Sequence, residues 1–205
     1  MKRLLAILWL ILLPLWATAQ PGGATDELLD ALQGVQQLQG NFEQRQYGNN
    51  DELLVESRGR FRLLRPGYFA WEILWPDNQL IIASPEFIWH YDQDLETATR
   101  RPVTDSAQMS PLQVLGGDAD ALRRRFNVEQ VAEGDFVLSP LTDDVGFQQL
   151  TLHLNGPVIT GMDILDNLNQ RVIIEFSQLD SDSGLTGEDF TFTPPDGIDL
   201  FYYDE

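Results

Sequence analysis

The 205-residue sequence contains no cysteine and little positive charge. Without cysteine it can form no disulfide, thiol nucleophile or thiolate metal site, and no cysteine is present to carry a lipid anchor. Thirteen basic residues stand against 32 acidic ones, which gives a net charge of −19, and Lys2 is the only lysine. A field of this sign argues against binding to nucleic acid and against adsorption to anionic lipid.

Patterns typical of catalytic centres are scarce as well. His90 and His153 each stand alone on an expected strand, and the sequence has no glycine-rich phosphate loop and no Gly-x-Ser-x-Gly turn. Ser84 with His90 is the one local pairing that could suggest an esterase, but no oxyanion motif accompanies it. The acidic loop at 180–189 has its glycine one position too early for a calcium loop. We therefore expect no enzyme activity, no metal and no cofactor.

The longest apolar run lies at the N-terminus. Lys2 and Arg3 precede an apolar stretch from Leu4 to Trp16, and Ala17-Thr18-Ala19 then provides small residues for a signal peptidase. The run is shorter than the roughly 20 apolar residues of a membrane span, so an anchor helix is the less favoured interpretation. We expect residues 1–19 to be a cleaved signal peptide and residues 20–205 to form a single exported domain.

A short amphipathic helix is expected at the start of this domain. Thr25 or Asp26 can cap it, and Leu28, Leu32 and Val35 repeat at the spacing of one helix face. Gly34 and Gly40 weaken the helical pattern and end it. Because only one face is apolar, the helix must lie on another element.

Most of the remaining sequence has the alternation of β-strands. Between residues 55 and 63 every second residue is charged, and turn signals such as Arg65-Pro66-Gly67 separate the segments. Two short helices, one from Ser110 and one from Asp118 to Arg124, interrupt the strands. The pattern predicts a mainly β fold of about eleven antiparallel strands, curled and covered by helices. The expected strands are 55–63, 69–73, 79–84, 87–92, 97–103, 126–132, 136–139, 147–154, 158–165, 170–179 and a tail or edge strand at 198–203.

Several short motifs, in order along the chain, resemble the outer-membrane lipoprotein carrier (LolA) family. The two most specific are Arg65-Pro66-Gly67-Tyr68-Phe69-Ala70-Trp71 and Phe190-Thr191-Phe192-Thr193-Pro194-Pro195-Asp196-Gly197. Residues 68–91 are also rich in aromatic side chains, which an ordinary β-core would explain on its own. The other matching segments are Phe42-Glu43-Gln44, Gly59-Arg60-Phe61, Trp75-Pro76, 79–84, Trp89-His90-Tyr91-Asp92, Asp94-Leu95-Glu96, Ser110-Pro111-Leu112 and 136–140.

The resemblance implies an unclosed antiparallel β-barrel covered by a helical lid, acting as a monomeric carrier in the periplasm. Such a carrier would take acylated lipoproteins from an inner-membrane ABC-type lipoprotein-releasing complex and deliver them to an outer-membrane receptor lipoprotein. A regulatory module that senses a lipid or a mislocalised lipoprotein on the same fold is the alternative.

The resemblance also implies the site residues. Arg65 matches the arginine that latches the lid by bonding to its backbone. Leu32 and Val35 match lid residues, and Leu112 and Leu115 match the middle helix. The full set expected to line a lipid-binding cavity is Leu32, Val35, Phe61, Phe69, Trp71, Ile73, Trp89, Leu112 and Leu115.

The expected signal peptide gives a first prediction. We expect the exported protein to begin at Gln20, because Ala17-Thr18-Ala19 follows the apolar run. The intact mass of protein taken from the periplasm measures this directly, and a mass that still includes Lys2 would contradict it.

Overall fold

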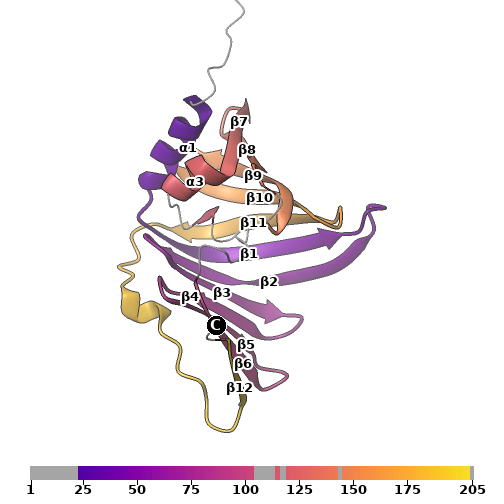
Figure 1. Cartoon of the computed structure of the whole chain (residues 1–205), viewed down its shortest axis with the longest axis vertical. Helices are drawn as coiled ribbons and strands as arrows, with labels where there is room; N and C mark the ends of the chain where they lie inside the picture. The colour runs from indigo at the N-terminus through magenta and orange to yellow at the C-terminus, as the bar shows by residue number, and fades with distance from the viewer. Residues whose placement is uncertain (1–22, 104–113, 116–118, 143–144, 204–205) are drawn as a thin grey trace, which may run out of the picture.

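The computed structural model describes residues 23–103, 114–115, 119–142 and 145–203. These residues form one twelve-stranded sheet that curls without closing (Figure 1). Its strand order is β12-β6-β5-β4-β3-β2-β1-β11-β10-β9-β8-β7. The mainly β, unclosed architecture with covering helices is therefore confirmed, with twelve strands in place of about eleven.

Two helices and one 3₁₀ turn accompany the strands. The helices are α1 (Gly23–Gln33) and α3 (Ala119–Arg125), and the 3₁₀ turn is η1 (Gly187–Phe190). The strands are β1 (Gln37–Tyr47), β2 (Leu53–Leu64), β3 (Tyr68–Trp75), β4 (Gln79–Ala83), β5 (Phe87–Asp92), β6 (Thr97–Pro102), β7 (Phe126–Ala132), β8 (Asp135–Pro140), β9 (Phe147–Asn155), β10 (Val158–Asp166), β11 (Arg171–Asp180) and β12 (Asp199–Tyr202).

Strand β1 is absent from the strands that the sequence predicts. It lies in the middle of the sheet and pairs along its length with β2 on one side and β11 on the other. Leu38 and Phe42 are its buried apolar residues, and Gly40 between them interrupts the alternation. Pairing with two neighbours, more than its own sequence, accounts for this strand. The helix before it ends at Gln33, so Val35 lies in the turn that follows.

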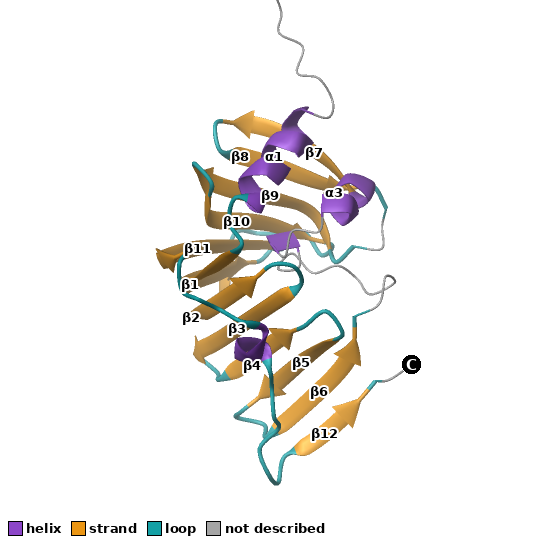
Figure 2. Ribbon diagram, turned by 90° about the vertical axis from the view of Figure 1, so that its left-hand side faces the viewer, coloured by secondary structure: helices purple, strands orange, loops and turns teal. Residues whose placement is uncertain are grey.

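The two faces of the sheet carry different clusters, because successive side chains of a strand point to opposite faces. Phe69 and Trp71 of β3 belong to the main cluster, which faces α1, and this side is called the inner face. Ala70 between them belongs to a small cluster with Ile82 and Phe190 on the outer face. Helix α1 packs against α3 and β7, and η1 packs against β3, as Figure 2 shows.

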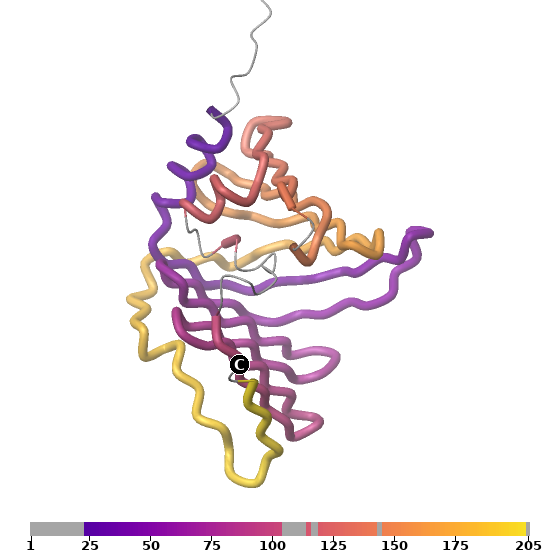
Figure 3. The backbone as a smooth tube through the Cα atoms, in the orientation of Figure 1, coloured from indigo at the N-terminus to yellow at the C-terminus, as the bar shows by residue number. Residues whose placement is uncertain are grey.

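The C-terminal segment joins the middle of the sheet to its far edge. After β11 the chain passes through η1 and reaches β12, drawn in yellow in Figure 3. Strand β12 pairs in parallel with β6, while every other neighbouring pair is antiparallel. The expected antiparallel sheet is thus confirmed, with β12, expected as a tail or edge strand, added in parallel at its edge.

Some expected features lie outside the described residues: the signal peptide, the helix start at Ser110, and Leu112. Within the described ranges, no helix has the length and apolar character needed to cross a membrane.

The contact between β2 and β3 yields a test of this packing. A Cβ at Gly59 would overlap the carbonyl oxygen of Glu72 and lie 2.8 Å from a ring carbon of Phe42. We expect Gly59→Ala to lower the free energy of unfolding by about 1–3 kcal/mol, the usual cost of overpacking. Urea denaturation measures this, with Gly23→Ala as the control because, apart from its chain neighbours and its own helix backbone, nothing lies within 4 Å of a Cβ placed there. Equal stability of the two variants would contradict the close approach of β2 and β3.

Candidate functional site

The inner face of the sheet is apolar almost from edge to edge. Its buried side chains form one continuous cluster, here called the inner cluster, to which β1 to β5, β7 to β11 and the helices contribute. Its members are Leu28, Leu29, Leu32, Val35, Leu38, Phe42, Phe61, Leu63, Phe69, Trp71, Ala83, Ile88, Val114, Leu115, Leu122, Phe126, Val128, Phe136, Leu138, Val145, Phe147, Leu150, Leu152, Leu154, Ile159, Met162, Ile164 and Ile174.

Helical side chains cover one part of this face. Leu28, Leu29 and Leu32 project from a single side of α1, and each has at most 1% of its surface exposed. Val114 and Leu115, which are also helical, join them in the inner cluster. The helices therefore occupy the space that a ligand on this face would need.

Polar contacts hold α1 in place at its rim. The Arg123 guanidinium of α3 lies 2.9 Å from the Asp26 carboxylate of α1, and the Gln130 amide of β7 donates to Glu27 at 3.0 Å. Both pairs are exposed, and exposed pairs contribute little stability. The cover thus depends chiefly on its apolar contacts and on one partly buried cation.

That cation is Arg65, at the turn after β2. Its guanidinium donates to the carbonyl oxygen of Leu115 through Nε at 3.2 Å and Nη2 at 2.7 Å. Through Nη1 it donates to the carbonyl oxygen of Val35 at 3.1 Å. The planar fork of one side chain thus joins two segments to the sheet: the turn that follows α1, and the helical residues 114–115.

Burial lowers the pKa of Arg65 to about 10. The group therefore remains protonated at neutral pH, and its donors face carbonyl oxygens rather than a carboxylate. A cation that loses water in this way carries a desolvation cost, which the three hydrogen bonds offset.

An aromatic group lies on the inner face, on strands near the middle of the sheet. Trp71 stacks on Phe42 with ring centroids 3.6 Å apart and on Phe69 at 5.9 Å. Phe61 lies 4.7 Å from Phe176 of β11. These rings join β1, β2, β3 and β11, so the widest apolar side chains gather at the middle of the inner face.

Seven of the nine residues expected to line a cavity lie together on the inner face. Leu32, Val35, Phe61, Phe69, Trp71 and Leu115 belong to the inner cluster, and Ile73 packs against it. Leu112 lies outside the described residues.

Trp89 is the exception, because the structure places it on the outer face. It belongs with the outer cluster and lies 5.2 Å from the ring of Phe192 and 6.0 Å from that of Tyr202. Its neighbour Ile88 points inward instead. Tyr91, two residues further along β5, also contacts the Phe192 ring, so this side of β5 is covered by the C-terminal segment.

Sequence reasoning missed several side chains of the inner face. Phe42 and Leu38 were overlooked because β1 was not predicted. Ile174, Met162 and Leu152 pair across β11, β10 and β9, and all are buried. Their alternation on expected strands was the available signal, but alternation does not say which face turns toward a ligand.

The candidate catalytic residues of the sequence lie in separate contacts in the structure. The described residues contain no group of three or more histidine or acidic side chains that could hold a metal ion. Ser84 Oγ donates to the carbonyl oxygen of Phe87 at 3.2 Å, and His90 Nε2 lies 3.3 Å from Gln79 Oε1. Ser84 and His90 are thus engaged in separate contacts. His153 Nδ1 lies 2.8 Å from Asp135 Oδ1 at the surface.

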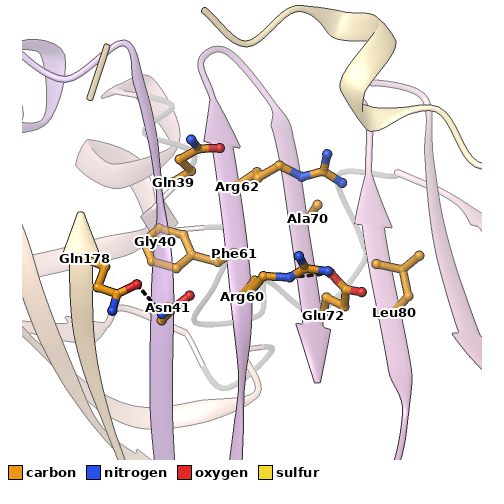
Figure 4. Close-up of a pocket in the computed structure, with 10 residues that line it drawn as sticks. All are labelled: Gln39, Gly40, Asn41, Arg60, Phe61, Arg62, Ala70, Glu72, Leu80 and Gln178. Atoms are coloured by element: carbon orange, nitrogen blue, oxygen red, sulfur yellow. Dashed lines mark hydrogen bonds and ion pairs between the residues drawn. The ribbon is translucent and has the colours of Figure 1, made fainter. Parts of the chain in front are cut away.

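A hollow of about 590 Å³ opens between β1, β2, β3, β4 and β11, and its lining mixes charged and amide side chains with apolar ones. Figure 4 shows Arg60 bonded to Glu72 and Asn41 bonded to Gln178 there. Arg62 lies in the same row and places its guanidinium 5.8 Å from the Phe190 ring, on the outer face. This hollow therefore does not extend the apolar inner face.

Curated relatives resemble the chain over most of its length. An outer-membrane lipoprotein carrier protein of Chromohalobacter salexigens is 33% identical over 97% of this chain and 96% of its own length. The protein of the same name from Coxiella burnetii is 32% identical over 86% of each chain.

Solved structures support the fold at lower identity. An uncharacterised conserved protein of Thermus thermophilus aligns with a TM-score of 0.54 at 14% identity, over 86% of this chain and 98% of its own. A LolA superfamily protein of Nitrosomonas europaea gives 0.51 at 11% identity, over 82% and 98%. The family model for the outer membrane lipoprotein carrier protein LolA matches residues 33–193. With this match and the curated relatives, the chain belongs to the outer membrane lipoprotein carrier protein LolA family.

Proposed function

We propose that this protein is a periplasmic carrier that binds the acyl chains of lipoproteins on its inner face and catalyses no reaction. One observation carries the proposal: a continuous apolar face is closed by helical segments that a single arginine, Arg65, joins to the sheet. Such a cover can leave without unfolding the sheet, which offers an acyl chain an apolar surface in place of water.

The energetics favour a cavity that closes on itself. An acyl chain of about 16 carbons has about 15 methylenes, each worth roughly 0.8 kcal/mol on burial, or about 12 kcal/mol in all. Several such chains would bind too tightly to be released. When Leu28, Leu29 and Leu32 fill the cavity, cargo must displace them, and the net affinity is a small difference between two large terms.

The route of the cargo follows from the same proposal. Acylated lipoproteins would come from an inner-membrane ABC-type lipoprotein-releasing complex and pass to an outer-membrane receptor lipoprotein, with the carrier acting as a monomer. The names of the relatives support a carrier of lipoproteins, and the signal-peptide pattern before Gln20 supports export.

The latch is tested by replacing Arg65. Charge-assisted hydrogen bonds are worth roughly 1.5–3 kcal/mol each, so their loss shifts the carrier toward its open form. We expect Arg65→Leu to bind cargo at least as well as the unaltered protein but to accumulate as a loaded complex. Arg65→Lys should transfer poorly or at an intermediate level, because an ammonium cannot span both carbonyl oxygens with the same geometry.

Transfer of a labelled lipoprotein from purified carrier to purified receptor measures this effect. Arg58→Leu is the matched control, since Arg58 lies exposed on the same strand, β2. Normal transfer by Arg65→Leu at unchanged cargo affinity would show that Arg65 is not a latch.

A tryptophan pair tests which face holds the acyl chains. Trp71 lies on the inner face and Trp89 on the outer face. We expect Trp71→Ala to weaken binding of a fluorescent fatty-acyl probe at least about tenfold, which corresponds to about 1.4 kcal/mol of lost contact. Trp89→Ala should leave probe affinity unchanged.

Both affinities are measured at a temperature at which the two variants are folded by circular dichroism, because truncation of a buried aromatic costs roughly 3–5 kcal/mol of stability. If the folded Trp71→Ala protein binds the probe with unchanged affinity, Trp71 is an ordinary core residue.

A further inference from the structure

At the end of the sheet formed by β4, β5 and β6, the inner face carries polar as well as apolar side chains. Between β4, β5, β6 and the residue after β12 lies a second hollow of about 560 Å³. The strand pairing sets Ile81 opposite His90, His90 opposite Thr99, and Ile88 opposite Arg101, so these side chains share one face. Its lining consists of Ile81, Ile88, His90, Thr99, Arg101 and Tyr203.

One wall of this hollow continues the apolar surface. Ile88 is a buried member of the inner cluster, and Ile81 packs against that cluster. An alkyl chain lying on these two residues would therefore run toward the aromatic group at Trp71 without crossing a polar strip. The volume lies within the roughly 300–1,000 Å³ of pockets for small ligands, enough for a single-chain lipid.

The other wall is polar and contains a cation. In the described part of the chain, the Arg101 side chain makes no hydrogen bond and no ion pair, while its backbone belongs to the ladder between β6 and β5. Its neighbour Arg100 points to the outer face, where it lies 4.5 Å from the Phe87 ring and 4.7 Å from the Tyr202 ring. Thr99 and Tyr203 add hydroxyl groups beside Arg101. Donors thus converge at the edge of an apolar surface.

The charge of Arg101 matters because the chain as a whole is strongly acidic, with a net charge of −19. Anions are repelled by that field, so a guanidinium that keeps its donors free at the mouth of a hollow supplies local attraction. Carboxylate and phosphate both match its planar fork.

We infer that this hollow binds a free single-chain lipid with an anionic headgroup, its alkyl chain on Ile81 and Ile88 and its carboxylate or phosphate on Arg101. This ligand is distinct from the acylated lipoprotein of the proposed function. It carries no protein, and the charge of its own headgroup determines its binding. The two ligands share the apolar wall but not Arg101.

Calorimetry on the full exported chain tests the inference with three lipids of equal chain length, each below its micelle concentration. The probes are myristate, myristoyl-lysophosphatidylglycerol and uncharged monomyristoylglycerol. We expect at least one anionic lipid to bind about tenfold more tightly than the uncharged one, and this preference to shrink at high salt. The two anionic probes separate a carboxylate ligand from a phosphate ligand.

Arg101→Gln should remove the preference, with no effect on monomyristoylglycerol. Arg58→Gln makes the same change of charge at an exposed site on β2 and should leave all three affinities unchanged. Equal affinity of the unaltered protein for the three lipids would overturn the inference, as would an equal loss for all three in Arg101→Gln.

The outcome is separable from that of the proposed function. If lipoprotein transfer is normal while headgroup charge has no effect on lipid binding, the inference fails and the carrier proposal stands. If anionic lipids are preferred through Arg101 but no lipoprotein passes to the receptor, the reverse holds.

Discussion

The apolar inner face of the sheet is the constraint on which the rest of the structure depends. A curled sheet that does not close cannot bury this face by itself, so other elements must cover it. Here α1 and the residues at 114–115 do so, with leucine side chains that are almost fully buried. Whatever replaces these leucines must offer comparable apolar area, which is why an alkyl chain is the natural alternative occupant.

Under the proposed carrier function, Arg65 is the group that makes this cover reversible. A purely apolar lid would have no defined closed position, whereas the guanidinium fixes two backbone carbonyls that belong to separate segments. Its burial opposes its own charge, as the lowered pKa indicates. Opening the lid returns the cation to water, and this regained hydration balances part of the lost hydrogen bonding. The closed and open forms can therefore lie close in free energy.

The sequence was informative wherever local pattern decides the structure. Alternation of charged and apolar residues from 55 to 63 predicts β2, and one apolar stripe predicts α1. Strand β1 was not predicted because its pairing with β11, which is distant in sequence, stabilises it. The expected place of Trp89 in the cavity differs from the structure because the aromatic side of β5 packs against Phe192 of a segment remote in sequence, while the inner side carries Ile88, His90 and Asp92. The partners of Arg65 lie 30 and 50 residues away, a distance that no local pattern encodes.

The C-terminal segment has a mechanical consequence for ligand binding. It leaves β11 in the middle of the sheet, presses Phe190 onto the outer face at Ala70 and Ile82, and ends at β12 on the far edge. A segment that spans the outer face of a curved sheet is stretched when the curvature of the sheet increases and is relaxed when the sheet flattens. The half of the sheet between β11 and β12 therefore resists rolling up around a slender ligand, yet can spread to admit a bulkier one. Under the proposed function, adjustment to small cargo then falls to the helices, while the strands keep a minimum internal width.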